Sequence, residues 1–139
     1  MLAVSGLSAS SRVGIAVGNL VAAGVWGAGG YALPLRFWVL DVPLVVTVAA
    51  LVVSAIAALA RAPWAELALK VAAWVLLGFG LLLVAITTLS MGFLSGVHGE
   101  FGTMGVLVMA LALSLVVPYA LAYPVFQLGW ALRERGAAR

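Results

Sequence analysis

Charged residues divide the chain into four long stretches that contain no Asp, Glu, Lys or Arg. The stretches run from Val13 to Leu35, Val42 to Ala60, Val71 to Val97 and Phe101 to Leu132. A helix needs roughly 20 apolar residues to cross a hydrocarbon core about 30 Å thick. The pattern therefore predicts an all-α chain, folded as one polytopic membrane domain over residues 1–139. We expect a four-helix transmembrane bundle with spans near 13–34, 42–60, 67–89 and 104–124, the first of them an uncleaved span.

The fourth uncharged stretch is longer than one span requires, and it contains Pro118 and Pro124. Proline removes a helical hydrogen bond and disfavours helix at the residue before it. We expect a kinked fourth helix, bent at Pro118, with a change of direction near Pro124. The tail over 125–135 mixes large apolar side chains with Gln and Arg, so it is predicted to form a short interfacial C-terminal helix.

The segment over 90–105, between the third and fourth spans, is both glycine-rich and apolar. Its glycines are Gly92, Gly96, Gly99, Gly102 and Gly105. Glycine at this density weakens a helix, yet the apolar residues between the glycines are poorly suited to a solvated loop. The segment is expected either to form an irregular cap, or to lie on the membrane surface, re-enter the bundle or press against a partner.

Basic residues are distributed unevenly between the two sides of a four-span chain. Only Arg36 falls on one side, whereas the side with both termini holds Arg12, Arg61, Lys70, Arg133, Arg135 and Arg139. Positive residues near short connections stay in the cytoplasm, so both termini are predicted to be cytoplasmic. Aromatic residues such as Trp64, Tyr119 and Tyr123 are placed at the cytoplasmic interface.

Composition narrows the class of protein further. Hydrophobic residues make up 66% of the chain and charged residues only 8%, against roughly 45–50% and about 25% in soluble domains. A soluble enzyme is therefore excluded. The chain has no cysteine, which excludes a disulfide scaffold and a thiolate metal site, and its net charge of +3 is too small to indicate nucleic-acid binding. Arginine outnumbers lysine, and Ala, Gly, Val and Leu dominate, which is typical of a GC-rich bacterium and suggests its inner (plasma) membrane.

Small residues recur at four-residue spacing in the first two spans. Because lipid provides little hydrophobic drive for helix association, such residues allow close helix packing. We expect smooth packing faces formed by Gly14, Gly18 and Ala22 in the first span and by Ala50, Ser54 and Ala58 in the second. Contact within the bundle is the simpler interpretation, and contact with another subunit is the alternative.

No ionisable residue lies near the middle of a predicted span, which argues against proton-coupled transport. Asn19 is the most polar residue within the first span and is expected to hydrogen-bond between helices. Thr87 and Thr88 are expected to bond carbonyl groups one turn earlier. All three residues also remain candidates for lining a solute path.

The only polar cluster with potential for chemistry is predicted on the outer side and comprises Arg36, Asp41, His98 and Glu100. One imidazole and one carboxylate are too few for a closed metal site, so no metal is assigned. A solvated loop is the simpler interpretation. No nucleophile motif accompanies the single histidine, and no catalytic residue is assigned.

Three functions remain open at this point. The first is a non-catalytic integral-membrane subunit that packs within or stabilises a larger membrane complex, with no cofactor but with room for bound lipid or quinone. Its partners would be the lipid bilayer and other membrane subunits. The second is a small homo-oligomeric channel or carrier for a neutral or anionic solute, formed by self-association. The third is a lipid-directed membrane enzyme that uses His98 and Glu100.

Overall fold

The protein is helical throughout the part of the chain that its computed structural model describes, which comprises residues 9–32, 37–97 and 99–129. No strand occurs among these residues. The helices are α1 (Ala9–Ala32), α2 (Trp38–Leu59), α3 (Ala65–Val97), α4 (Gly99–Val117) and the π-helix η2 (Pro118–Ala122). A further α-helical segment over 123–129 follows η2 directly.

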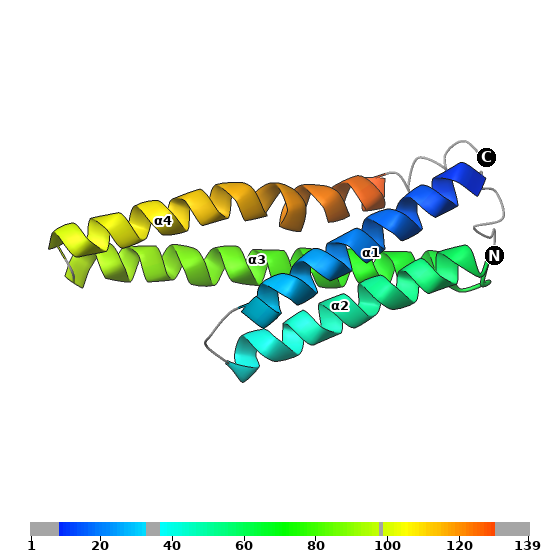
Figure 1. Cartoon of the computed structure of the whole chain (residues 1–139), viewed down its shortest axis with the longest axis horizontal. Coiled ribbons are helices and arrows are strands. Elements are labelled where there is room, and N and C mark those ends of the chain that lie inside the picture. The colour runs from blue at the N-terminus through cyan, green and yellow to red at the C-terminus, as the bar shows by residue number, and fades with distance from the viewer. Residues whose placement is uncertain (1–8, 33–36, 98, 130–139) are drawn as a thin grey trace.

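The helices form two hairpins of unequal length that cross one another (Figure 1). Helix α2 packs against α1 and α3, and α3 also packs against α4 and η2. The beginning of α1 and the α2–α3 turn lie at one end of the molecule, and the segment over 123–129 points towards this end but stops short of it (Figure 1). At the other end, the α3–α4 hairpin extends well past the α1–α2 hairpin.

Within the described ranges of the chain, three helices are long and apolar enough to cross a membrane: α1, α2 and the part of α3 over 65–94. This confirms the predicted all-helical class and the membrane character of the chain. A shorter apolar helix covers 102–111 within α4. Large apolar side chains such as Val25, Val45 and Leu81 are exposed on these helices, an arrangement that is stable when hydrocarbon rather than water surrounds them.

Alanine dominates the buried interior, so the helices can approach one another closely. The larger fully buried apolar residues are Leu51 and Leu76, which form the main core layer with Ala23 and Ala72. Close packing of small side chains maximises van der Waals contact, which is the main attraction between helices in lipid.

The segment over 90–105, for which a cap, a surface-lying segment, a re-entrant segment and a partner contact were left open, is helical in most of its length. Helix α3 continues to Val97 and α4 begins at Gly99. Glycine costs about 1 kcal/mol in a helix relative to alanine. An unpaired backbone group that is covered by apolar surface, whether lipid or protein, costs several kcal/mol, and this larger penalty favours the helix over an irregular loop.

The chain remains helical on both sides of Pro124, where a change of direction was expected. Pro118 and Pro124 are accommodated by one turn of π-helix, η2, after which α-helical geometry resumes over 123–129. Residues 125–129 therefore continue the fourth helix instead of starting a separate interfacial one. The remainder of that predicted helix, 130–135, lies outside the described residues.

The α2–α3 turn contains the one non-glycine residue with positive φ in the described chain, Arg61 at φ 54°. Ala60 caps α2, and the Ala62 N–H donates to the Ala57 carbonyl at 3.0 Å, the hydrogen bond of a Schellman motif. Ala62 also packs against Ala57 and Ala65. A left-handed residue at this position is normally glycine, because a Cβ atom there adds steric strain.

We therefore expect Arg61→Gly to stabilise the protein by about 1 kcal/mol, through the relief of left-handed strain. Equilibrium unfolding in bicelles measures the change. Arg61→Ala is the matched control, because it removes the same charge but keeps the Cβ atom. Equal stability of the two variants would show that strain at this residue is unimportant.

Candidate functional site

A cluster of neutral polar side chains is buried between α1, α2 and the segment over 123–129. Its centre is Asn19, which is fully buried and lies about 10 Å beyond Arg12 along α1. The Asn19 Nδ2 atom donates to Ser54 Oγ at 2.8 Å. The Asn19 Oδ1 atom accepts hydrogen bonds from Tyr123 OH at 2.8 Å and from Gln127 Nε2. One amide thus joins three helical segments.

Ser54 completes the cluster on α2. It is fully buried, and its hydroxyl donates to the Leu51 carbonyl at 2.8 Å while accepting from Asn19. Both polar functions of the hydroxyl are therefore satisfied, as burial in an apolar interior requires. The cluster contains no carboxylate, imidazole or amine, so it is suited to holding helices together rather than to proton transfer.

The π-helix η2 sets which face of the following segment meets Asn19. A π-bulge adds one residue to the helix, and one residue corresponds to about 100° of rotation about the helix axis. Tyr123 and Gln127 follow η2 at four-residue spacing and so share one face. The extra residue turns that face towards α1, where both side chains bond Asn19.

Tyr123 and Gln127 are the members of the cluster that sequence reasoning missed. Tyr123 was assigned to the cytoplasmic interface and Gln127 to a separate interfacial helix. Their four-residue spacing was a visible signal of a shared polar face. The partner of that face was not visible, because Asn19 is more than 100 residues away in the chain.

The predicted packing residues occupy different environments. Ser54 and Ala58 are buried, and Ala22 and Ala50 are partly buried against the main core layer. A Cβ atom on Gly18 would lie 2.5 Å from Tyr123 OH, so Gly18 makes room for this tyrosine. A Cβ atom on Gly14 would meet nothing within 4 Å, and Gly14 therefore makes no close helix contact in the described chain.

We expect Gly18→Leu to destabilise the bundle by about 3 kcal/mol, since overpacking costs 1–3 kcal/mol or more and the new side chain would displace the Tyr123 hydroxyl from Asn19. Leu20→Ala, on an exposed position of the same helix, should cost much less. Thermal unfolding of both variants in the same detergent tests the difference. Equal losses would contradict the role of Gly18.

Thr87 and Thr88 do not join the cluster. Each hydroxyl donates to a carbonyl one turn earlier, Thr87 to Leu83 and Thr88 to Val84, both at 2.8 Å. Thr87 lies about 16 Å along α3 from Leu76 of the core layer, at 1.5 Å per residue. The two threonines therefore have the structural hydrogen bonds expected of them and form no continuous polar path with Asn19.

The predicted outer cluster is described only in part. Asp41 lies in the first turn of α2, Glu100 lies at the beginning of α4, and Arg36 and His98 lie outside the described residues. Val42, the neighbour of Asp41, lies level with Leu82 of α3, because both residues line an apolar groove between α2 and α3. Helix α3 continues about 22 Å beyond Leu82 before α4 begins. The backbones at Asp41 and Glu100 are therefore at different heights and do not form one site.

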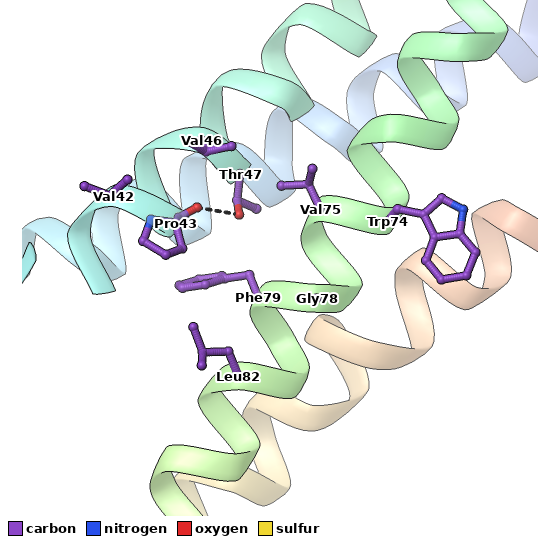
Figure 2. A pocket seen from close by; sticks show the side chains of 9 residues that line it. All are labelled: Val42, Pro43, Val46, Thr47, Trp74, Val75, Gly78, Phe79 and Leu82. Carbon is purple, nitrogen blue, oxygen red and sulfur yellow. Dashed lines mark hydrogen bonds between the residues drawn. The ribbon is translucent and has the colours of Figure 1, made fainter. Parts of the chain in front are cut away.

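An open apolar groove of about 340 Å³ runs between α2 and α3 (Figure 2). It is lined by Val42, Pro43, Val46, Thr47, Trp74, Val75, Gly78, Phe79 and Leu82. Thr47 and Phe79 are buried beside it, whereas Val42 and Trp74 are exposed at its edges. The only side-chain hydroxyl in the groove, on Thr47, donates to the Pro43 carbonyl at 2.7 Å. The groove thus offers an apolar surface without an unpaired hydroxyl.

Comparison with protein-family models, with curated proteins and with solved structures finds no match to this chain.

Proposed function

We propose that this protein is a non-catalytic subunit of a larger complex in the plasma membrane of a bacterium. In this proposal the chain spans the membrane four times, with α4, η2 and the segment over 123–129 as the fourth span. Both termini are cytoplasmic. The subunit stabilises its complex by helix packing, and the observation that carries the proposal is the long α3–α4 hairpin.

The length of this hairpin exceeds what a bilayer requires. Pro43 of α2 lies level with Phe79 and Leu82 of α3 in the groove. At 1.5 Å per residue, the beginning of α2 at Trp38 is then level with about Thr87, and α3 extends about 15 Å further. We call this projecting part, residues 88–105, the hairpin tip.

The hairpin tip is apolar although it projects past the neighbouring helices. The exposed fractions are 75% for Leu89, 68% for Phe93 and 69% for Met104. Where the tip projects past the hydrocarbon core, exposure of these apolar side chains to water is unfavourable. Exposed apolar surfaces of this kind mark interaction sites. A protein partner that covers the tip would remove the surface from water.

Charges at the opposite end support the proposed orientation. Arg12, Arg61 and Lys70 all lie towards the end of the molecule that holds the α2–α3 turn. Lys70 Nζ pairs with Glu66 Oε1 at 2.6 Å across one helical turn. Basic residues beside short connections favour the cytoplasmic side, which agrees with both termini being cytoplasmic.

Mild detergent extraction of the native membrane tests the subunit role. The chain should migrate with other polypeptides, and the double variant Leu89→Ala, Phe93→Ala should release it from them. The control is Val21→Ala, Val25→Ala, which removes apolar side chains that are about equally exposed on α1. Migration of the native chain alone, or unchanged association of the tip variant, would contradict the proposal.

Single cysteines test the topology, because the natural chain contains none. A membrane-impermeant maleimide applied to intact cells that overproduce the chain, so that most copies lack the partner at the hairpin tip, should label Tyr31→Cys and Thr103→Cys. It should not label Ser10→Cys or Ala60→Cys until the membrane is opened. The reverse pattern would overturn the orientation. If only one of Ser10→Cys and Thr103→Cys were labelled from the side opposite to the one stated, the four-span arrangement would be overturned.

The alternative of a self-assembling channel is less well supported. It would use Asn19 and Ser54 to line a pore, but both side chains are fully buried within a single chain and are bonded to each other. Opening a pore at this position would require these hydrogen bonds to break. Solute flux through vesicles that contain only the purified chain would favour the channel over the subunit role.

A further inference from the structure

We propose that the groove between α2 and α3 binds one acyl chain of a bilayer phospholipid. This inference requires that α2 and α3 cross the bilayer, which their length and composition support. It goes beyond the proposed subunit role, and it would stand if the protein acted alone.

The position of the groove favours a hydrocarbon occupant. Trp74 and Leu82, which line it from α3, lie about 6 and 18 Å beyond Lys70 along the helix. The groove therefore falls within the stretch of α3 that would occupy the hydrocarbon core. The groove is open to its surroundings, and in a bilayer its opening faces acyl chains rather than water.

The chemistry of the lining points to the same occupant. The Thr47 hydroxyl is already bonded to the Pro43 carbonyl (Figure 2), so an occupant need not supply a hydrogen bond. The remaining lining side chains that the groove exposes are aliphatic or aromatic. The volume of about 340 Å³ lies at the lower end of the range of about 300–1,000 Å³ for ligand sites, which suits a slender chain better than a bulky ligand or a helix.

Gly78 explains why the groove is deep enough to hold an acyl chain. It lies on α3 between Val75 and Phe79, and a Cβ atom on it would meet nothing within 4 Å. The glycine therefore leaves space that no neighbouring helix uses. Beside it, Phe79 is held in place by an edge-to-face contact with Trp26 of α1, with the ring centroids 5.4 Å apart. A fixed wall and an unfilled position together make a persistent groove.

Photolabelling tests this inference with the purified full chain in vesicles of phosphatidylethanolamine and phosphatidylglycerol. A small fraction of phosphatidylcholine would carry a diazirine on one acyl chain, and mass spectrometry would locate the labelled residues. We expect labelling over 42–47 and 74–82 to exceed labelling of the α1 surface around Gly24. Equal labelling of the two surfaces would indicate ordinary boundary lipid and overturn the inference.

Gly78→Leu should fill the groove and lower its labelling to the level of the α1 surface. Gly24→Leu is the matched control, because Gly24 is also an exposed helical glycine without atoms near its Cβ position, and it should leave groove labelling unchanged. Unchanged labelling in Gly78→Leu would overturn the inference. Stronger displacement of the label by a long-chain quinone than by unlabelled phospholipid would also overturn it, in favour of a quinone tail.

Discussion

Replacement of Asn19 by leucine is expected to destabilise the protein by about 2 kcal/mol, because side-chain hydrogen bonds between membrane helices contribute about 0.6 kcal/mol each on average and the partners are left buried without them. Asn19 accepts from Tyr123 and Gln127 and donates to Ser54. All three partners belong to other helical segments, so loss of these hydrogen bonds weakens the packing between segments rather than α1 itself. The free energy of unfolding in bicelles, measured by steric trapping, is the direct test.

Thr88→Val is a suitable control for Asn19→Leu. It also replaces a polar residue by an apolar one of similar size within a membrane helix, but the Thr88 hydroxyl is exposed and bonds only its own helix. We expect a change within about 0.5 kcal/mol for this variant, as for most surface substitutions. If Asn19→Leu were as mild as Thr88→Val, the cluster would not hold the helices together.

The uncharged stretches predicted the helices well because the constraint behind them is strong. A chain in hydrocarbon must satisfy its backbone hydrogen bonds internally, and helices do so within one segment. The segment over 90–105 was less predictable, and the sequence left its conformation open. The glycines over 90–105 were interpreted with helix propensities that apply in water, whereas α3 and α4 remain helical through most of this segment.

The polar cluster was only half predictable. Asn19 was identifiable as a residue that needs partners, since an amide in an apolar span is costly without hydrogen bonds. Its partners depend on the register of the segment after η2. A π-helix shifts that register by one residue, and local sequence does not determine whether two nearby prolines produce a π-helix, a kink or a turn. Tyr123 and Gln127 therefore became visible only with the three-dimensional structure.

The second large effect is expected at Gly80, where α3 meets η2. A Cβ atom on Gly80 would lie 2.8 Å from the Ala120 carbonyl oxygen and 3.0 Å from the Ala120 Cβ. These atoms belong to backbone or to a side chain that cannot rotate away, and Ala120 is fully buried. We expect Gly80→Leu to cost about 3 kcal/mol or more, because overpacking forces the backbone to shift.

Gly78→Leu provides a close control for Gly80→Leu, since both change a glycine of the same helix to leucine and Gly78 has open space at its Cβ position. The two variants gain the same helix propensity, so the difference between them measures the contact with η2. We expect Gly78→Leu to keep or slightly raise the free energy of unfolding. Similar losses in both variants would contradict a tight contact between Gly80 and Ala120.

The contact at Gly80 and the cluster at Asn19 should also be energetically coupled. Ala120 and Tyr123 lie within one helical turn, and Pro124 cannot supply an α-helical hydrogen bond to the Ala120 carbonyl. A leucine at position 80 would push this turn away from α3 and carry Tyr123 out of register with Asn19. Gly80→Leu should therefore cost less in the Asn19→Leu background than in the natural chain, and a double-mutant cycle of unfolding free energies measures the coupling. Strict additivity would mean that η2 does not position the cluster.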